Sequence, residues 1–72
     1  MDFQERLRMA IARKNYKLDD LAEKTGIAVG TIGNWKKGKT DPSFFCLMCL
    51  AEVLEVSLDW LAWGEKYGKV QM

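Results

Sequence analysis

Apolar residues recur along much of the chain at intervals of three and four, which is the period of an amphipathic α-helix. The first apolar stripe consists of Phe3, Leu7, Ala10 and Ile11. Asp2 precedes this stripe and Glu5 stands three residues later, which is the spacing of a capping box. The pattern therefore predicts a first helix that Asp2 caps and that ends near Asn15.

Two short helices are predicted next, from about residue 18 to 25 and from about residue 29 to 37. Gly26 and Gly38 follow them directly, and glycine readily adopts the positive φ with which many helices end. Ile32 and Trp35 have the helical spacing of side chains that are buried against a neighbouring helix. Only three residues separate the two helices, so we expect a tight turn between them.

A fourth helix is predicted from Asp41-Pro42, because aspartate caps helices and proline fits their first position. Ser43 is the alternative cap. We expect this helix to continue to about Glu55, and it is the most apolar segment of the chain. Its buried side chains are expected to be Phe44, Leu47, Met48, Leu50, Ala51 and Leu54.

A fifth helix is predicted to start at Ser57, a capping residue, and to end at Gly64. The chain has no strand-like alternation, internal repeat or low-complexity tract. The fold class is therefore predicted to be all-α, with five helices in one compact domain over residues 1–64. We expect residues 65–72 to form a loosely ordered tail.

The bulk composition limits the function classes. With 72 residues, 49% of them hydrophobic, the chain is globular, and a single core of this size supplies only ~3–5 kcal/mol. Self-association is therefore expected. The longest uncharged apolar run, residues 44–51, is too short to span a bilayer, and the acidic N-terminus does not resemble a secretory signal. The cytoplasm is the expected compartment, with no membrane partner.

Charge is distributed unevenly, although the net charge is only +1. Residues 1–40 hold nine Lys or Arg against five Asp or Glu, whereas residues 41–72 hold two against five. A local basic surface binds polyanions even when the whole molecule is nearly neutral. The N-terminal half is therefore the candidate nucleic-acid surface.

One motif combines these signals. The segment 21–38 reads Leu21-Ala22-x-x-x-Gly26-Ile27-x-x-x-x-Ile32-x-x-Trp35-x-x-Gly38. It resembles the helix-turn-helix of the phage-repressor-like family (lambda repressor and Cro type, XRE-like), and the resemblance covers roughly residues 3–64. It implies a five-helix DNA-binding fold whose third helix enters the major groove of double-stranded DNA.

The resemblance also implies which residues face the groove: Val29, Gly30, Thr31, Gly33 and Asn34. Thr31 and Asn34 are the polar candidates for reading bases, and Val29 is a candidate contact for a thymine methyl group. Each glycine within a helix costs ~1 kcal/mol relative to alanine. A close approach to DNA or to the second helix would explain Gly30 and Gly33, and simple tolerance on a surface is the alternative.

Four lysines are candidate phosphate contacts: Lys17, Lys36, Lys37 and Lys39. Lys17 stands where the N–H groups that open the second helix can also hold a phosphate. A solvated charge run is the alternative for the other three. The family usually has Ser or Thr, then Gln, where this chain has Lys17 and Leu18, and it often has a Ser cap where this chain has Ala28. These departures predict few direct base contacts.

Other chemistry has little support in the sequence. Cys46 and Cys49 form a C-x-x-C, but a structural zinc site needs four ligands, and the chain has no histidine and no further cysteine. We interpret both cysteines as small hydrophobic residues. Because the chain also lacks a serine or cysteine with a partnering base and a phosphate-binding glycine loop, we expect no enzyme, metal or cofactor.

Several residues are more apolar than the family pattern. Phe45, Cys49 and Trp63 stand where family members commonly carry polar residues, so they are candidates for a dimer interface. Trp60 precedes Trp63 by three residues and is expected to close the core, while Tyr67 continues the aromatic spacing. The resemblance implies pairing through this end of the fold.

Two functions follow as hypotheses. The first is a sequence-specific, nucleoid-associated transcriptional regulator, expected to be a repressor that binds a pseudo-palindromic operator as a homodimer and to come from a phage or mobile element. The second is a protein-interaction module, such as an antitoxin or a degenerate helix-turn-helix, with weak or non-specific DNA binding. The sequence gives neither the operator nor the regulated genes, and it leaves open whether the protein activates or represses.

Overall fold

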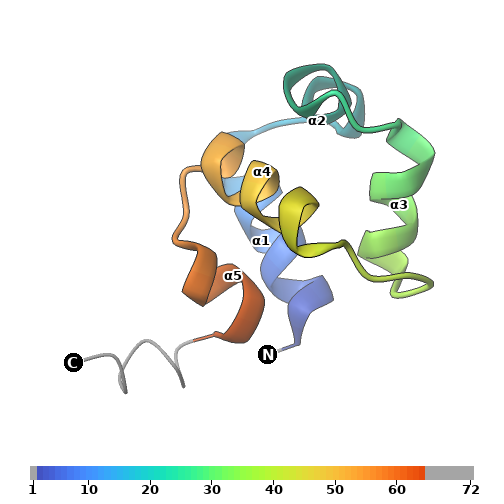
Figure 1. The fold of residues 1–72 in the computed structure, drawn as a ribbon. Coiled ribbons are helices and arrows are strands. Elements are labelled where there is room, and N and C mark those ends of the chain that lie inside the picture. The colour runs from blue at the N-terminus through green and yellow to red at the C-terminus, as the bar shows by residue number, and fades with distance from the viewer. Residues whose placement is uncertain (1, 65–72) are drawn as a thin grey trace.

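Five helices make up the part of the chain that the computed structural model describes, residues 2–64. They are α1 (Phe3–Lys14), α2 (Leu18–Thr25), α3 (Val29–Lys37), α4 (Phe44–Leu54) and α5 (Leu58–Trp63). Figure 1 shows α3 at one edge of the molecule and α4 near its centre. No strand occurs among residues 2–64, so the predicted all-α, five-helix fold is confirmed. The tail predicted at residues 65–72, with Tyr67, lies outside the described residues.

The ends of the first helix follow the predicted local chemistry. Asp2 Oδ1 accepts a hydrogen bond from the Glu5 backbone N at 2.9 Å, and Glu5 Oε1 accepts one from the Asp2 backbone N at 3.3 Å. This reciprocal pair is the predicted capping box. Asn15 ends the helix with a φ of 62°, a left-handed conformation that asparagine tolerates better than most residues.

The fourth helix starts at the second of the two predicted caps, Ser43. Ser43, and not Asp41-Pro42, is the cap, since its Oγ accepts a hydrogen bond from the Cys46 backbone N at 3.3 Å. Residues 38–43 instead form the connection that leads from the end of α3 to α4 (Figure 1). A helix that began at Pro42 would shorten this connection.

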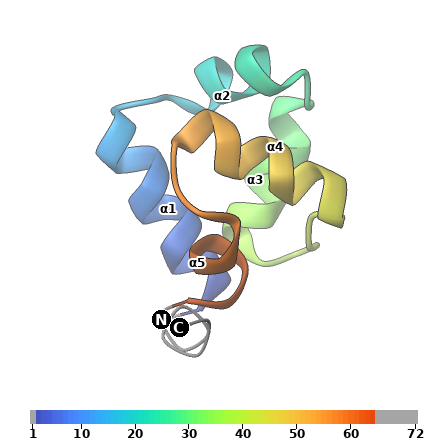
Figure 2. The ribbon, with the colours of Figure 1, turned by 60° about the vertical axis from the view of Figure 1, so that its left-hand side comes forward.

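A single hydrophobic core lies among the five helices. Its buried apolar side chains are Leu7, Ala10, Ile11, Leu21, Ile32, Trp35, Leu50, Ala51, Leu54 and Leu61. The first helix packs against α3, α4 and α5, while α2 packs against α3 and α4. Figure 2 shows α4 in front of α3, with α1 and α5 beside it. This packing fixes α3 on its inner face and leaves its outer face free.

Two residues predicted to be buried on α4 are exposed. Phe44 is 68% and Met48 is 45% accessible to solvent. Since successive residues turn by about 100° in a helix, Phe44 and Met48 lie about 120° and 160° around the axis from Leu50. Leu50 and Leu54 define the buried side. The segment is apolar on more than one face, so its composition did not reveal which face is buried.

Three arginines of α1 bind the C-terminal carbonyl groups of three other helices. Arg6 Nε and Nη2 donate to the carbonyl oxygens of residues 61 and 62, at 3.0 and 2.9 Å. Arg8 Nη1 donates to Lys36 O at 2.9 Å, and Arg13 Nη2 donates to the carbonyl oxygens of residues 54 and 55. Cations stabilise helix C-termini through the helix dipole. The first helix therefore holds α3, α4 and α5 at their ends.

Candidate nucleic-acid interface

The turn between α2 and α3 is closed by short-range hydrogen bonds. Gly26 adopts a φ of 76°, and its N–H donates to Ala22 O at 2.8 Å. Thr25 Oγ1 donates to Leu21 O at 2.7 Å and accepts from the Ile27 backbone N at 3.2 Å. Residues 26–28 alone connect the two helices, so the predicted tight turn is confirmed.

The third helix has one buried and one open side. Ile32 and Trp35 are buried in the core, as predicted. Val29, Gly30 and Thr31 are exposed at the start of the helix. Gly33 and Asn34 are half-buried. The helix lies at the edge of the molecule in Figure 1, so the five residues proposed to face the groove occupy a helix that a large ligand can approach.

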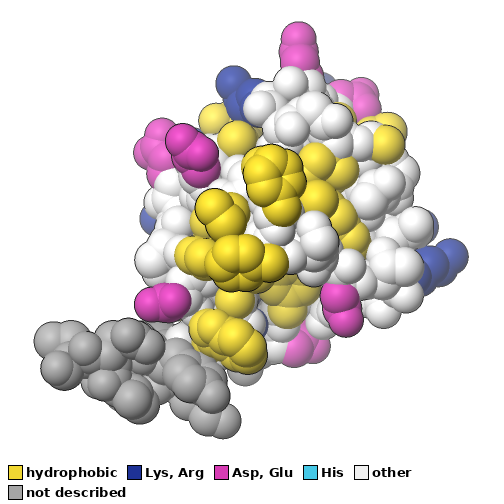
Figure 3. Space-filling model, viewed as in Figure 1, with side chains coloured by type: hydrophobic (Ala, Val, Ile, Leu, Met, Phe, Trp, Pro, Cys, Tyr) yellow, Lys and Arg dark blue, Asp and Glu magenta, His cyan; other side chains and the backbone are white. Residues whose placement is uncertain are grey.

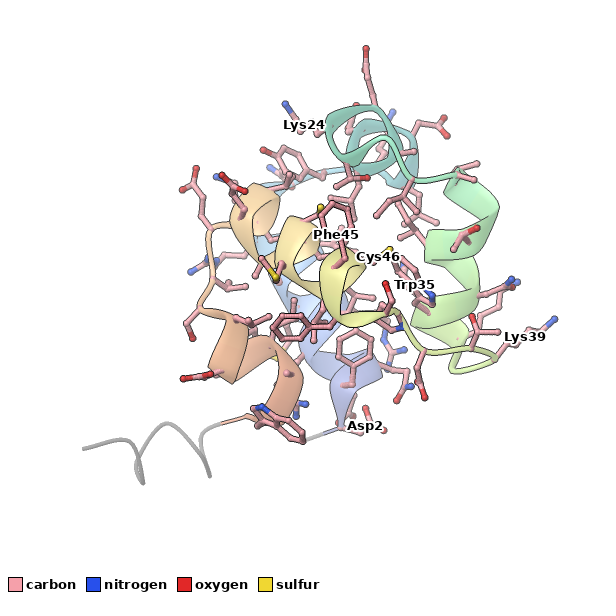
Figure 4. The ribbon with its side chains drawn as sticks, in the orientation of Figure 1. Asp2, Lys24, Trp35, Lys39, Phe45 and Cys46 are labelled. Carbon is pink, nitrogen blue, oxygen red and sulfur yellow. The ribbon has the colours of Figure 1, made fainter. Side chains whose placement is uncertain are left out.

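Three of the four predicted phosphate contacts gather at one place. Lys36 is half-buried and Lys37 exposed in the last turn of α3, and the exposed Lys39 follows in the connection after it. Figure 4 shows Lys39 pointing away from the body of the protein. Lys17 is exposed at the start of α2 and belongs to a different element. Lys17 therefore lies at the start of α2, whereas the other three lysines lie at the end of α3 and just after it.

Both helices of the pair start without a capping side chain. No side chain caps α3 at Ala28, whose carbonyl oxygen accepts from the backbone N of Thr31 and Ile32 at 3.1 and 3.2 Å. At the start of α2, Asp20 Oδ2 accepts from the Lys17 backbone N at 2.9 Å. Intrahelical bonds cannot satisfy the first N–H groups of a helix, so the start of α3 offers hydrogen-bond donors to an external anion. The first turn of α2 also contains the carboxylates of Asp19 and Asp20.

The two glycines of α3 are not explained by close packing within the protein. A Cβ at Gly30 would meet nothing within 4 Å, and a Cβ at Gly33 would lie 3.9 Å from Leu18 Cδ1, an ordinary contact. Of the explanations offered by the sequence, a close approach of the second helix therefore does not apply. An approach by DNA and simple tolerance on the surface are the two remaining explanations.

A hollow of about 550 Å³ lies between α1 and the end of α3. Arg8 from α1, and Lys36 and Lys37 from α3, supply its positive charges. Sequence reasoning missed Arg8, because its partner Lys36 is 28 residues away in the chain. The only signal was its basic side chain on the predicted first helix, and this did not indicate what it would face.

The two cysteines are both half-buried free thiols on α4. Residues 2–64 contain no group of three or more His, Cys, Asp or Glu side chains arranged to hold a metal ion. The cysteines contribute to the apolar character of α4. Within the same residues no helix has the length and apolarity needed to cross a membrane.

A second surface feature is apolar. The exposed large hydrophobic residues of α4 and α5 are Phe44, Phe45, Met48 and Trp63, of which Phe45 is 71% and Trp63 is 59% accessible. Figure 3 shows hydrophobic side chains gathered on the face formed by these two helices, and we call these four residues the α4–α5 patch. Cys49 is half-buried nearby on α4, and Trp60 packs against the core, as expected.

Comparison with known proteins gives a consistent picture. A family model described as helix-turn-helix matches residues 7–61. An uncharacterized HTH-type transcriptional regulator of Haemophilus influenzae is 41% identical over 64 residues, and the HTH-type transcriptional activator BcrR of Enterococcus faecalis is 32% identical over 66 residues. The uncharacterized HTH-type transcriptional regulator YqaE of Bacillus subtilis is 31% identical over 68 residues.

These matches cover 89%, 92% and 94% of this chain but only 26%, 32% and 59% of the respective relatives. A similar fold occurs in the crystal structure of the P22 c2 repressor protein in complex with synthetic operator 9T in the presence of Tl+. The TM-score is 0.83 at 25% sequence identity, over 89% of this chain and 97% of that chain. The matched region includes the α2–turn–α3 unit and the core around it.

Proposed function

The chain belongs to the helix-turn-helix family, of the phage-repressor-like type, and on this premise we propose that it is a sequence-specific DNA-binding transcriptional regulator. The observation that carries the proposal is the open face of α3, which ends in a cluster of three lysines. Three relatives are named as HTH-type transcriptional regulators or activators, and the structural neighbour is a repressor bound to an operator.

In this proposal α3 enters the major groove and α2 lies across the backbone. Thr31 and Asn34 read base edges, and Val29 contacts a thymine methyl group. The cluster of Lys36, Lys37 and Lys39 binds phosphates on one side of the groove. Lys17 and the backbone N–H groups at the start of α2 bind another phosphate. The proposed role is binding, without a catalytic step.

The protein is further proposed to act as a homodimer on a pseudo-palindromic operator, with half-sites about one helical turn (~34 Å) apart. Repression would follow because the bound dimer blocks RNA polymerase. Phe45 and Trp63 of the α4–α5 patch, with Cys49 beside them, are the proposed dimer contacts. Aromatic residues are enriched in interfaces, and an exposed apolar surface of this kind favours association in water. A phage or mobile-element origin stays a prediction.

The first experiment is selection from a randomised duplex library by the purified chain, at 50 mM and at physiological salt. Enrichment of a two-fold symmetric motif that survives the higher salt supports a specific dimeric regulator. The variant Lys36→Glu/Lys37→Glu should lose binding while retaining its helical circular dichroism. Binding without a motif, seen only at low salt, would contradict sequence-specific regulation.

The α4–α5 patch also favours a second candidate function, a protein-interaction module. In that case the chain uses the patch to bind another protein and its DNA binding is weak. The two candidates differ in one measurable property. Charge reversal at Lys36 and Lys37 abolishes the activity of a DNA-binding regulator but leaves the affinity of an interaction module for its protein partner unchanged.

A further inference from the structure

The hollow between α1 and the end of α3 has an excess of positive charge in its lining. Arg8, Lys36 and Lys37 contribute three positive charges to it, and Asp2 contributes one negative charge. A surface hollow with this balance attracts an anion. It adjoins the side of α3 that is proposed to face DNA, because Gly33 lies in its wall.

Arg8 is held in place before any ligand arrives. Its Nη1 donates to Lys36 O at 2.9 Å, although the side chain is exposed and 28 residues separate the two positions. A guanidinium group has five N–H donors in a rigid fork, so this single bond leaves donors for a phosphate oxygen. Fixing the fork in advance reduces the rotamer entropy lost on binding.

Gly33 keeps the hollow open on the side of α3. It lies in the hollow wall without a side chain, and a Cβ there would stand 3.9 Å from Leu18 Cδ1. Packing within the protein therefore does not require glycine at this position. A larger side chain would occupy the space through which a DNA strand beside α3 reaches the three cations.

We propose that Arg8 is a DNA-binding residue: it binds a backbone phosphate in this hollow while its bond to Lys36 O fixes the end of α3. Lys36 and Lys37 share the same phosphate or its neighbour, and Asp2 opposes the binding. This inference rests on the proposed function, since it adds a contact from α1 to the α2–α3 surface.

The test is the salt dependence of duplex binding, measured by fluorescence anisotropy with the full chain and a labelled 20-base-pair duplex. Each phosphate contact contributes about −0.9 to the slope of log Kobs against log salt. Arg8→Gln should make the slope shallower by about one and should weaken binding roughly eightfold at 0.1 M salt. An unchanged slope would overturn the proposal.

Arg13→Gln is the matched control. Arg13 also lies on α1 and also binds the carbonyl groups at a helix end, those of residues 54 and 55, but it does not line the hollow. The variant loses the same charge and a comparable cap, so its slope should equal that of the wild type. If both variants reduce the slope equally, the effect comes from the change in net charge, and the proposed phosphate contact of Arg8 is wrong.

Asp2→Asn removes a negative charge from the hollow, so its effect on DNA affinity should be opposite to that of Arg8→Gln. Asparagine caps helices as well as aspartate does, so α1 should keep its N-terminus while the opposing charge disappears. We expect tighter binding at low salt, and an unchanged or weaker affinity contradicts the proposed site. Failure of the wild-type chain to bind any duplex at 50 mM salt would overturn the proposed function itself, which distinguishes that result from a failure of Arg8 alone.

Discussion

Arg6 is the only charged residue among the buried side chains of residues 2–64, at 6% accessibility. Its hydrogen bonds to the carbonyl oxygens of residues 61 and 62 join the first helix to the last. Gly64 makes room for this contact, because a Cβ there would lie 3.1 Å from Arg6 Nη1. Burying a guanidinium is tolerated because it is hydrogen-bonded, and its removal leaves the carbonyl groups at the end of α5 without their donor.

Arg6→Met should lower the free energy of unfolding by roughly 2–4 kcal/mol, since hydrogen bonds to a charged group contribute about 1.5–3 kcal/mol and the carbonyl groups lose their partner. Urea unfolding followed by circular dichroism measures this change. Arg13→Met, an exposed arginine in the same helix, should cost less than about 1 kcal/mol. Equal decreases in unfolding free energy for the two variants would contradict the argument that Arg6 contributes more because it is buried.

Gly30 and Gly26 belong to the same motif but differ in backbone conformation, so replacing each with alanine should have opposite effects on stability. A Cβ at Gly30 meets open space inside a helix, so Gly30→Ala should raise the unfolding free energy by up to about 1 kcal/mol. Gly26 also has open space but a φ of 76°, so Gly26→Ala should be destabilising. Thermal unfolding of both variants decides the matter, and stabilisation by Gly26→Ala would contradict the conformational argument.

Local chemistry could be predicted residue by residue, and long-range contacts could not. The capping box of Asp2 and Glu5 and the positive φ of Gly26 involve partners within four residues, which a sequence displays directly. The partners of Arg6 lie 55 and 56 residues away, and that of Arg8 lies 28 residues away. Nothing in a basic residue on a helix indicates which distant carbonyl group it will bind.

At the level of elements, the helix pair α2–α3 was the most predictable part because glycine stops and apolar spacing agree there. The fourth helix was less so, since two start signals stand side by side and its apolar residues surround the axis. In the structure the face of α4 with Leu50 and Leu54 is buried, and the helix starts after the Ser43 cap. Tertiary packing, which the sequence does not display, decided which face of α4 is buried.

The cap of α4 can be tested by two matched substitutions. Ser43→Ala should destabilise the protein by about 1 kcal/mol, because the Cys46 backbone N loses its acceptor. Asp41→Ala should have an effect within about 0.5 kcal/mol, since Asp41 is exposed and lies outside the helix. Chemical denaturation measures both. A larger loss for Asp41→Ala would restore the alternative start at Asp41-Pro42.

In the whole molecule, the proposed DNA surface and the α4–α5 patch occupy different sides. Hydrophobic side chains gather in the middle of the face that Figure 3 presents, whereas α3 lies at the edge of the same view in Figure 1. The four residues of the patch carry no charge, whereas Lys36, Lys37 and Lys39 lie at the end of α3 and just after it. The proposed DNA contacts and the proposed protein contacts therefore involve different residues.

This arrangement makes the dimer proposal testable apart from DNA binding. Phe45→Glu/Trp63→Glu places two carboxylates in the patch, where association would bury them unpaired, so self-association should be lost. Sedimentation equilibrium should show monomers, and affinity for a symmetric operator should fall while binding to an isolated half-site stays within about twofold. Met9→Glu is the control, because Met9 is exposed on α1 and outside the patch. The dimer proposal would be contradicted by a wild-type protein that is monomeric at micromolar concentration, or by a variant that still dimerises. The patch would then be a candidate surface for a different protein.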